Sequence, residues 1–342
     1  MNNLCNKFIE KLCFSSNNII SKIEFPTICD GKYSLENNLQ SGYSGKVFKG
    51  HYNEIPVVIK CCRKFSSWSI EVKALKQLKH ENIIEIIGRP QSHILGTEYT
   101  LGKYYKTYTQ DYFPHIHVLA QEFAIYGDLH NLLKKHGSFE EKWARTFLKS
   151  ILNGLVYAYE EKKISHRDVK LENIFISDKG IIKVGDWGLS AFNTHNRLCS
   201  TSCGTLGYMS PKMICNQKYD SNKSDVWSLG VLLFSLCTGV RPYKDPAKRV
   251  SSNCNDNEWM DQWLLCMVKG KWRLWWRSHQ TTTPIINNLS HELCDLIERM
   301  FCGNEKDRIS LSEILDHEWM TGDVYSNKEV IELCKKNQTE AR

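Results

Sequence analysis

The spacing of apolar residues divides the chain into a strand-rich first part and a helix-rich second part. From Tyr33 the stretch YSLENNLQSGYSGKVFKGHYNEIPVVIKCC is strand-like, and it is broken by a glycine-bearing turn and by a turn at Asn53–Glu54. This pattern predicts three strands, the last ending near Lys60. The segments NIIEIIG (82–88) and HIHVLAQEFA (115–124) predict two more strands.

Helical spacing begins between these strands and dominates after Gly127. In SWSIEVKALKQLKH, apolar residues fall at Ile70, Ala74, Leu75 and Leu78, which predicts an amphipathic helix. Further on, DLHNLLKKH, EEKWARTFLKSILNGLVYAYEEK and SDVWSLGVLLFSLCTG are also helical in pattern. We therefore expect a small β-rich lobe followed by a larger helical lobe.

Three segments fall outside this plan. Residues 1–32 form a polar-apolar extension with one expected helix around Asn6–Cys13, and residues 321–342 form a tail without a recognisable domain. A tyrosine-rich insert spans 89–114, where the tyrosines either cap the small lobe or serve another role.

Composition narrows the class of protein. The chain has 342 residues and a net charge of +7, without a long Lys/Arg block, so we expect no nucleic-acid partner. No run reaches the about 18 apolar residues of a membrane span, and no secretory or myristoylation signal is present. The fourteen cysteines lack zinc-ligand spacing and are interpreted as free thiols. These features predict a cytoplasmic protein without a membrane partner, and a nuclear pool stays open.

The stretch ISHRDVKLENIFIS, from Ile164 to Ser177, concentrates charged residues between two apolar runs. Phosphoryl transfer needs a carboxylate near the attacking hydroxyl and oxygen ligands for Mg²⁺. Asp168 suits the base, Lys170 suits a cation beside the transferring group, and Asn173 suits a metal ligand. In KVGDWGLS, Asp186 supplies a second metal ligand. We therefore interpret the charged stretch as a catalytic loop between two short strands.

A phosphate-binding turn and a cation precede this loop. LQSGYSGKV contains Gly42 and Gly45, which permit close approach of backbone N–H groups to phosphates, and Val47 is placed to cover a base. Lys60 ends the third predicted strand and Glu71 lies on the following helix. Each is a weak signal alone, because surface charges and glycine turns are common. Their order along the chain (turn, strand, lysine, helix, glutamate) makes the combined signal stronger.

Taken together, these motifs resemble the eukaryotic protein kinase family over residues 33–320. The order of the motifs matches the family: the glycine loop at 39–47, Lys60, Glu71, HRDVKLEN, DWG, GTLGYMSPK, SDVWSLG and KDRIS with Arg308. The resemblance implies an α+β, bilobal fold with an antiparallel small-lobe sheet (33–123) and a helical large lobe (124–320). It is looser toward the calcium/calmodulin-dependent, polo-like and NIMA-related groups.

The resemblance also assigns roles. Asp168 would be the base, with Lys170 and Asn173 as further catalytic residues, and Asn173 and Asp186 would bind Mg²⁺. Gln121 falls at the gatekeeper position, beside backbone groups that would contact adenine. The positions expected to bind ATP are Leu39, Gly42, Gly45, Val47, Val58, Lys60, Glu71, Glu122, Ala124, Asp128, Phe175 and Asp186.

Substrate type and regulation follow from the same comparison. Lys170 and Thr205 match the serine/threonine branch of the family. Asp128 and Glu172 match positions that bind basic residues upstream of a target in some kinases, although both acids are common in kinases without that preference. Thr201 matches an activating phosphosite that an upstream kinase or autophosphorylation would modify. Arg167 is its expected charge partner, and Ser200 and Ser202 are competing sites.

Several positions depart from the family pattern. Gln40 replaces the first glycine of the loop, Trp187 replaces a phenylalanine, and Phe175 and Val58 change the floor and roof of the adenine pocket. At Lys212 the family has a glutamate paired with the arginine that matches Arg308. We expect two cations to face each other there unless Glu305 or Asp307 intervenes, and we expect Lys212→Glu to raise the melting temperature.

Two alternatives remain beside an active protein kinase. A pseudokinase scaffold would bind partners without turnover, with support only from Gln40 and Lys212. A small-molecule kinase is disfavoured by GTLGYMSPK and SDVWSLG, which resemble the platform for protein substrates. The cluster at Trp272–Trp276 is interpreted as a packing anchor, with a partner-docking site as the alternative.

Overall fold

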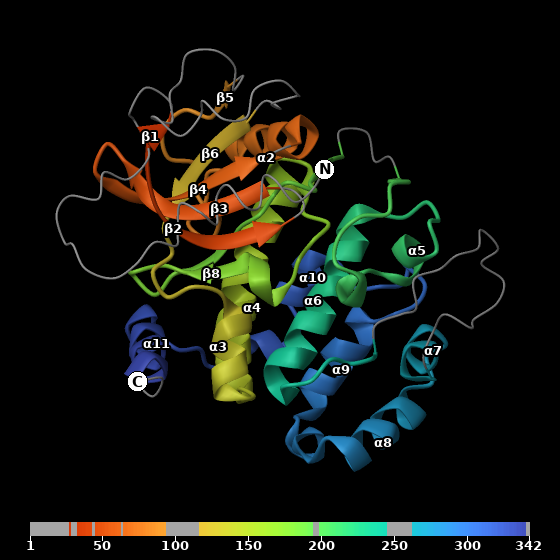
Figure 1. Cartoon of the computed structure of the whole chain (residues 1–342). Coiled ribbons are helices and arrows are strands. Elements are labelled where there is room, and N and C mark those ends of the chain that lie inside the picture. The colour runs from red at the N-terminus through yellow and green to blue at the C-terminus, as the bar shows by residue number, and fades with distance from the viewer. Residues whose placement is uncertain are drawn as a thin grey trace.

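The computed structural model describes residues 27–28, 33–42, 45–62, 64–93, 116–193, 198–244 and 262–339. A sheet-bearing lobe lies above a larger helical lobe (Figure 1). This arrangement confirms the predicted α+β, bilobal fold. The expected helix at Asn6–Cys13 and most of the tyrosine-rich insert lie outside the described residues.

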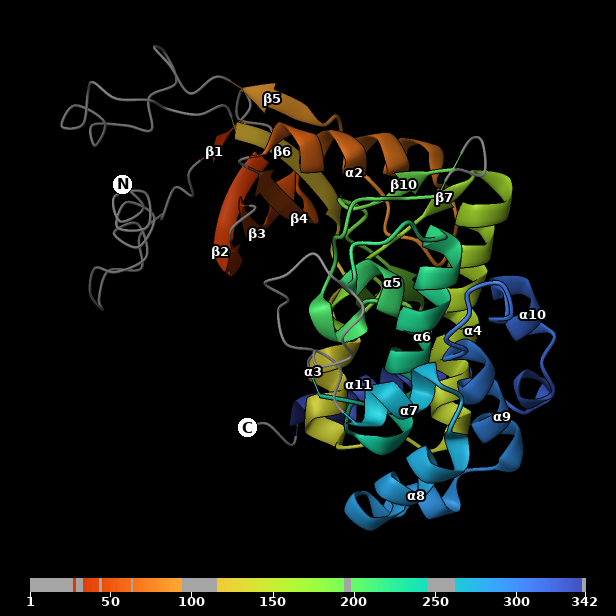
Figure 2. The same cartoon turned by 90° about the vertical axis from the view of Figure 1, so that its right-hand side faces the viewer.

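The small lobe is built on one antiparallel sheet with strand order β1-β2-β3-β4-β6-β5. Asn53 and Glu54 both have positive φ (46° and 70°), as a tight hairpin turn requires, so the turn predicted there is confirmed. Helix α2, at Phe65–Gln77, packs against β4 and β6 (Figure 2). The strands are β1 (Thr27–Ile28), β2 (Tyr33–Gly42), β3 (Gly45–Tyr52), β4 (Ile55–Cys62), β5 (Gln91–His93) and β6 (Ile116–Glu122).

The strand predicted at residues 82–88 is wrong. Ile83 makes an isolated bridge to Val184 in the large lobe, and Ile86 makes one to Gln121 in the small lobe. The segment changes its partner between these residues, so no continuous ladder forms. The strand of this region is β5, which pairs with β6 and occupies residues assigned above to the insert.

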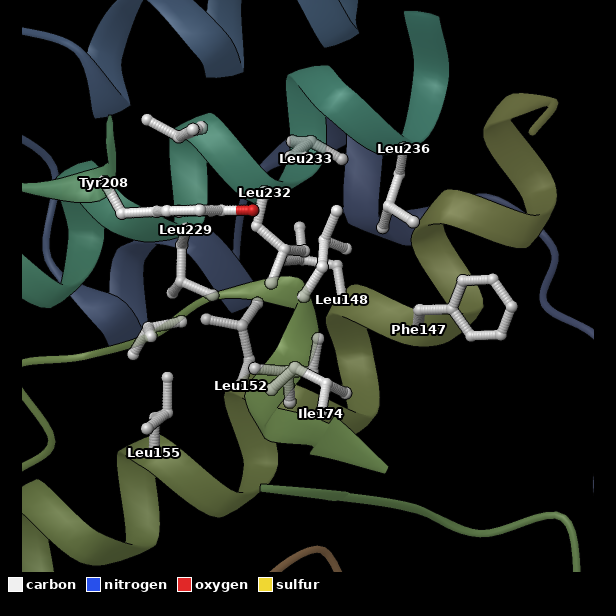
Figure 3. Close-up of a cluster of buried hydrophobic side chains, with 14 of the residues drawn as sticks. Phe147, Leu148, Leu152, Leu155, Ile174, Tyr208, Leu229, Leu232, Leu233 and Leu236 are labelled. Carbon is white, nitrogen blue, oxygen red and sulfur yellow. The ribbon is translucent and has the colours of Figure 1, made fainter. Parts of the chain in front are cut away.

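The large lobe is organised around α6, whose residues are almost all buried. Asp220 caps its start by accepting from the N–H groups of Asn222 and Lys223, and Gly239 ends it at φ 76°. Leucines of α6 meet those of α4 and Ile174 of β8 in the core (Figure 3). The helices are α3 (Leu129–His136), α4 (Glu141–Val156), α5 (Pro211–Ile214), α6 (Ser221–Thr238), α7 (Gln262–Val268), α8 (Trp272–Thr282), α9 (His291–Met300), α10 (Leu311–Leu315) and α11 (Asn327–Thr339).

Two small antiparallel pairs hold the charged loop identified in the sequence. β7 (Ile164–Ser165) pairs with β10 (Ala191–Phe192), and β8 (Ile174–Ile176) pairs with β9 (Ile182–Val184). The loop therefore runs between two short strands, as predicted. Each end of the loop is tied to a different strand pair, which limits its freedom. Among the described residues, no helix is long and apolar enough to cross a membrane.

The tryptophan cluster is a packing element. Trp275 is fully buried, and its ring lies 5.3 Å from that of Phe234 on α6. The indole N–H of Trp276 donates to Glu298 of α9 at 2.7 Å. These contacts confirm the packing interpretation of Trp275 and fix α8 against two other helices.

The segment after residue 320 is folded against the large lobe. The Tyr325 ring stacks on Trp143 of α4 at a centroid distance of 3.8 Å, and the Tyr325 N–H donates to Thr146. Helix α11 follows, buries Val330 and Cys334, and lies beside α3 (Figure 1). The tail is therefore part of the structural unit.

Candidate active site

A charged network of Lys60, Glu71 and Asp186 joins the two lobes, and the region around it is called the cleft below. The Lys60 ammonium on β4 lies 2.6 Å from a Glu71 carboxylate oxygen on α2 and 3.1 Å from an Asp186 oxygen after β9. Burial acts to lower the pKa of Lys60, but the charges of Asp186 and Glu71 outweigh it and raise that pKa. Lys60 therefore stays protonated and can face phosphate groups.

A second network surrounds Asp168. One carboxylate oxygen accepts from both the N–H and the hydroxyl of Thr205, each at 2.8 Å. The other oxygen lies 2.9 Å from the Lys170 ammonium and 3.3 Å from the Asn173 amide nitrogen. The Thr205 hydroxyl also accepts from Lys170 at 2.8 Å. The two oxygens of the carboxylate are thus held by different partners.

The backbone of this loop is anchored by Asp225, which sequence reasoning left without a role although it lies in SDVWSLG. Its two carboxylate oxygens accept from the N–H groups of His166 and Arg167, each at 2.7 Å. Arg167 has φ 67°, a conformation that L side chains rarely adopt. The Asp225 carboxylate therefore stabilises the strained turn that presents Asp168.

Asn173 and Asp186 fit the metal site expected of them. The Asn173 amide nitrogen donates to the Asp168 carbonyl at 2.8 Å, which leaves the amide oxygen for a ligand. Lys60 lowers the pKa of Asp186, and the Asp186 side chain is 47% exposed. An ionised carboxylate and an amide oxygen are donors that Mg²⁺ accepts.

The expected nucleotide pocket is framed by β2, β3 and β4. Gly42 pairs with Gly45 at the turn, whose tip, 43–44, lies outside the described residues. Val47 pairs with Lys60, and Val58 pairs with Gln121. Leu39, on β2, is 52% exposed. These positions lie on three neighbouring strands of the small-lobe sheet, and Phe175 belongs to β8 of the large lobe.

Residues 122–128 connect the lobes. The Glu122 N–H donates to the Glu85 carbonyl at 3.0 Å, and the Ala124 carbonyl accepts from the Gly127 N–H at 3.1 Å. The adenine contacts expected of Glu122 and Ala124 stay predictions. Asp128 caps α3 by accepting from the Asn131 N–H at 2.7 Å. Its carboxylate is therefore fixed in place at the edge of the pocket.

Trp187 is the anchor that we expected to hold Asp186. Its side chain is fully buried, its indole N–H donates to the Val184 carbonyl at 3.1 Å, and its ring packs on His166 at 4.6 Å between centroids. Asp186 itself has φ 60°. The buried Trp187 side chain holds the neighbouring Asp186 backbone in this conformation, in which the Asp186 carboxylate contacts Lys60.

Comparison with known proteins decides the family. A family model described as the protein kinase domain matches residues 33–320 of this chain. The chain belongs to the protein kinase domain family. This membership confirms the resemblance drawn from the motifs.

Curated relatives agree with this assignment. CBL-interacting serine/threonine-protein kinase 17 of Arabidopsis thaliana is 30% identical over 308 residues, which cover 86% of this chain and 60% of the relative. The probable serine/threonine-protein kinase MARK-B of Dictyostelium discoideum is 29% identical, over 90% of this chain and 39% of the relative. An Aurora kinase of Saccharomyces cerevisiae is 31% identical, over 59% and 48%. The chain thus spans 60% or less of the length of these relatives.

In this kinase domain, Thr201 lies in an exposed part of the segment that follows β10. Its carbonyl accepts from the Tyr219 hydroxyl at 2.8 Å, and that hydroxyl in turn accepts from the Arg167 guanidinium at 3.4 Å. Arg167 also donates to the Leu189 carbonyl at 2.6 Å. The guanidinium expected to bind a phosphate is therefore already placed, through Tyr219, beside the Thr201 backbone.

The Lys212 position of the kinase domain differs from our expectation of two opposed cations. Lys212 lies 2.8 Å from Glu305, which is 4% exposed, while Arg308 is 2% exposed and donates to the carbonyls of Cys302 and Lys223. Burial lowers the pKa of Arg308 to about 10, and the charge of Glu305 opposes that shift. Glu305, not Asp307, pairs with Lys212 and supplies a negative charge near Arg308, so the expected gain from Lys212→Glu no longer holds.

Proposed function

We propose that the chain is a serine/threonine protein kinase that transfers the γ-phosphoryl group of ATP, with Mg²⁺, to serine or threonine hydroxyls of proteins. The observation that carries this proposal is the hydrogen-bonded group of Asp168, Lys170 and Thr205. It offers a fixed carboxylate and an adjacent cation where a hydroxyl and a transferring phosphoryl group would meet. Curated relatives named serine/threonine-protein kinases support it.

The residues would divide the reaction between positioning and charge. Asp168 would accept the hydrogen bond of the attacking hydroxyl and receive its proton as the oxygen–phosphorus bond forms. Lys60 and Lys170 would neutralise phosphate oxygens while the bond to the departing ADP oxygen breaks. Mg²⁺ held by Asn173 and Asp186 would offset the remaining charge on the phosphates. No catalytic position named above is lost, so no observation favours a scaffold without turnover.

The test is transfer of label from radioactive ATP to a generic basic protein and to the chain itself. We expect label on serine or threonine in the wild type, and a loss of about a thousandfold in Asp168→Asn, the scale of a missing general base. Mass spectrometry would locate the sites. Label on tyrosine, or equal transfer by the variant, would contradict the proposal.

Activation by phosphorylation at Thr201 is a further part of the proposal. A phosphate there would add charge-assisted hydrogen bonds to Arg167, next to the catalytic loop. We expect Thr201→Ala to lower activity after exposure to an activating kinase, while Ser200→Ala and Ser202→Ala do not. Undiminished activity in Thr201→Ala would exclude this site.

Selection of targets with upstream basic residues and a cytoplasmic location complete the proposal. Glu172 is exposed on the loop, where it can meet a substrate cation, while both oxygens of Asp128 already accept from Asn131. A peptide array that shows no enrichment of Arg or Lys upstream of the target would contradict the proposed basic-directed selection. Imaging of a labelled chain would test the proposed cytoplasmic location.

A further inference from the structure

The Glu71 carboxylate is in an unfavourable place for a negative charge. It is 3% exposed, and a second carboxylate, that of Asp186, lies near the same lysine. Burial raises the pKa of Glu71, the charge of Lys60 opposes this, and Asp186 adds to it. A buried carboxylate is stable only when hydrogen-bond donors face it.

A donor besides Lys60 does face it. The Gln121 amide nitrogen, on β6, donates to Glu71 at 2.8 Å, and the accepting oxygen is the one that Lys60 contacts. Gln121 is 4% exposed. A single oxygen therefore receives one charged and one neutral donor, both in a region from which water is excluded.

Strand register explains why these two donors converge. Lys60 of β4 pairs with Leu119 of β6, and Val58 pairs with Gln121. Lys60 and Gln121 are consequently diagonal neighbours on the same face of the sheet, a separation that long side chains can bridge. That face is the one against which α2 presents Glu71.

We propose that Gln121 is a positioning residue for phosphoryl transfer: its amide holds Glu71, and so α2, in place while Lys60 contacts the nucleotide phosphates. This role rests on the proposed function. When the Lys60 ammonium turns toward a phosphate, its hold on Glu71 weakens, and the amide keeps the carboxylate docked against the sheet. The gatekeeper side chain then acts on phosphates that it does not itself touch.

A purely structural role would have a different signature. If Gln121 only forms the wall behind the adenine, its substitution changes affinity for adenosine and for ATP by the same factor. If it positions Lys60 through Glu71, only the phosphate-dependent part of ATP affinity falls. The ratio of the two affinities separates the two cases and needs no turnover.

The experiment compares Gln121→Met, which keeps the length of the side chain without a donor, with the smaller Gln121→Leu. Calorimetry would measure binding of ATP and of adenosine, in chains that also carry Asp168→Asn to prevent turnover. We expect ATP affinity to fall about tenfold, the scale of one hydrogen bond to a charged group, and adenosine affinity to change by less than about twofold. Gln77→Met, at an exposed glutamine of α2, is the matched control and should leave both affinities unchanged.

A double-mutant cycle completes the test. In a Glu71→Gln background, Gln121→Met should no longer lower ATP affinity, because the charged acceptor is gone. Equal losses for ATP and adenosine, no loss of ATP affinity, or the same loss in the Glu71→Gln background would overturn the inference. Without Asp168→Asn, the kcat of Gln121→Met should fall while its KM for the protein substrate stays unchanged.

The two proposals fail separately. If the wild type transfers label and the binding ratio is unchanged in Gln121→Met, the positioning role is wrong and the kinase assignment stands. If no transfer occurs but the ATP-selective loss appears, Gln121 does position Lys60 and the proposed function is at fault.

Discussion

The cleft and the large lobe at α5 each contain a lysine–glutamate pair with a third charged residue nearby. In the cleft, the Lys60 and Glu71 side chains are 15% and 4% exposed, and the third side chain, that of Asp186, is 47% exposed. In the group at α5, the Lys212 side chain is 38% exposed, that of Glu305 is 5% exposed, and the third residue, Arg308, is buried. The side chain most exposed to solvent is therefore an acid in the cleft and a base in the α5 group.

This difference shows how one kind of interaction serves two purposes. The cleft group exposes its acid, the member that a divalent cation would need, and keeps the lysine protonated. The α5 group exposes its lysine and buries the acid near an arginine. We therefore expect changes in the cleft to alter chemistry and changes in the α5 group to alter stability.

The largest expected effect is in the α5 group. Glu305→Gln should lower the free energy of unfolding by about 3 kcal/mol, toward the lower end of the range for breaking a buried ion pair. Arg308 would then lose the negative charge that offsets its burial. Urea denaturation measures the change, with Glu332→Gln, at an exposed position of α11, as control. If the folded variant also loses ATP affinity, this group does not act on stability alone and the contrast with the cleft is wrong.

Removal of the central cation from the cleft should act on chemistry instead. Lys60→Met is expected to lower kcat/KM about a hundredfold, as loss of one preorganised transition-state contact does. Lys49→Met, at a half-exposed lysine of β3 that pairs with Glu36, is the control and should retain wild-type activity. Steady-state kinetics of both variants measure the effect. If Lys60→Met keeps its activity, the phosphates are bound by other residues.

A smaller effect should follow from Lys212→Glu. This change replaces an ion pair with two carboxylates and should destabilise the domain by about 1–2 kcal/mol, since Lys212 is partly exposed. In the Glu305→Gln background the sign should reverse, because the new carboxylate would face Arg308 alone. Urea midpoints of the single and double variants test this. If Lys212→Glu destabilises both backgrounds equally, residues 212 and 305 are not energetically coupled.

The smallest expected effect is on pH dependence, since a buried histidine lies beside the cleft group. Burial lowers the pKa of His166 below 6.5, so the folded state holds it neutral. The unfolded chain takes up the proton first as pH falls below 6.5, so the stability contributed by neutral His166 is present above that pH and lost below it. Between pH 6.5 and 5.5, wild type should lose more stability than His166→Gln, by at most about 1 kcal/mol, the loss for a group that stays neutral throughout in the folded state.

The control for this pH effect is His130→Gln, at an exposed histidine of α3, which should keep the wild-type slope. Urea denaturation at each pH gives the slopes. Parallel slopes for wild type and His166→Gln would show that the folded and unfolded states bind protons at this residue equally.

Sequence reasoning succeeded where a structure is determined by a short motif or by a regular spacing of apolar residues. The strands from Tyr33, the helix containing Glu71 and the loop around Asp168 each carry their pattern within a short stretch. It failed at residues 82–88, because Ile83 and Ile86 bond to different lobes and no local pattern records that change. The Gln121–Glu71 bond depends on strand register, and the Lys212–Glu305 pair joins residues far apart in sequence.

The docking of Tyr325 and α11 also affects where the domain can be cut. The family match ends at residue 320, yet the Trp143 ring is covered by Tyr325, and Val330 is 1% exposed on the helix beyond. A chain cut after Met320 would expose to water the apolar surface that Tyr325 and α11 cover. We expect it to aggregate at concentrations where a chain that extends through Thr339 stays monodisperse.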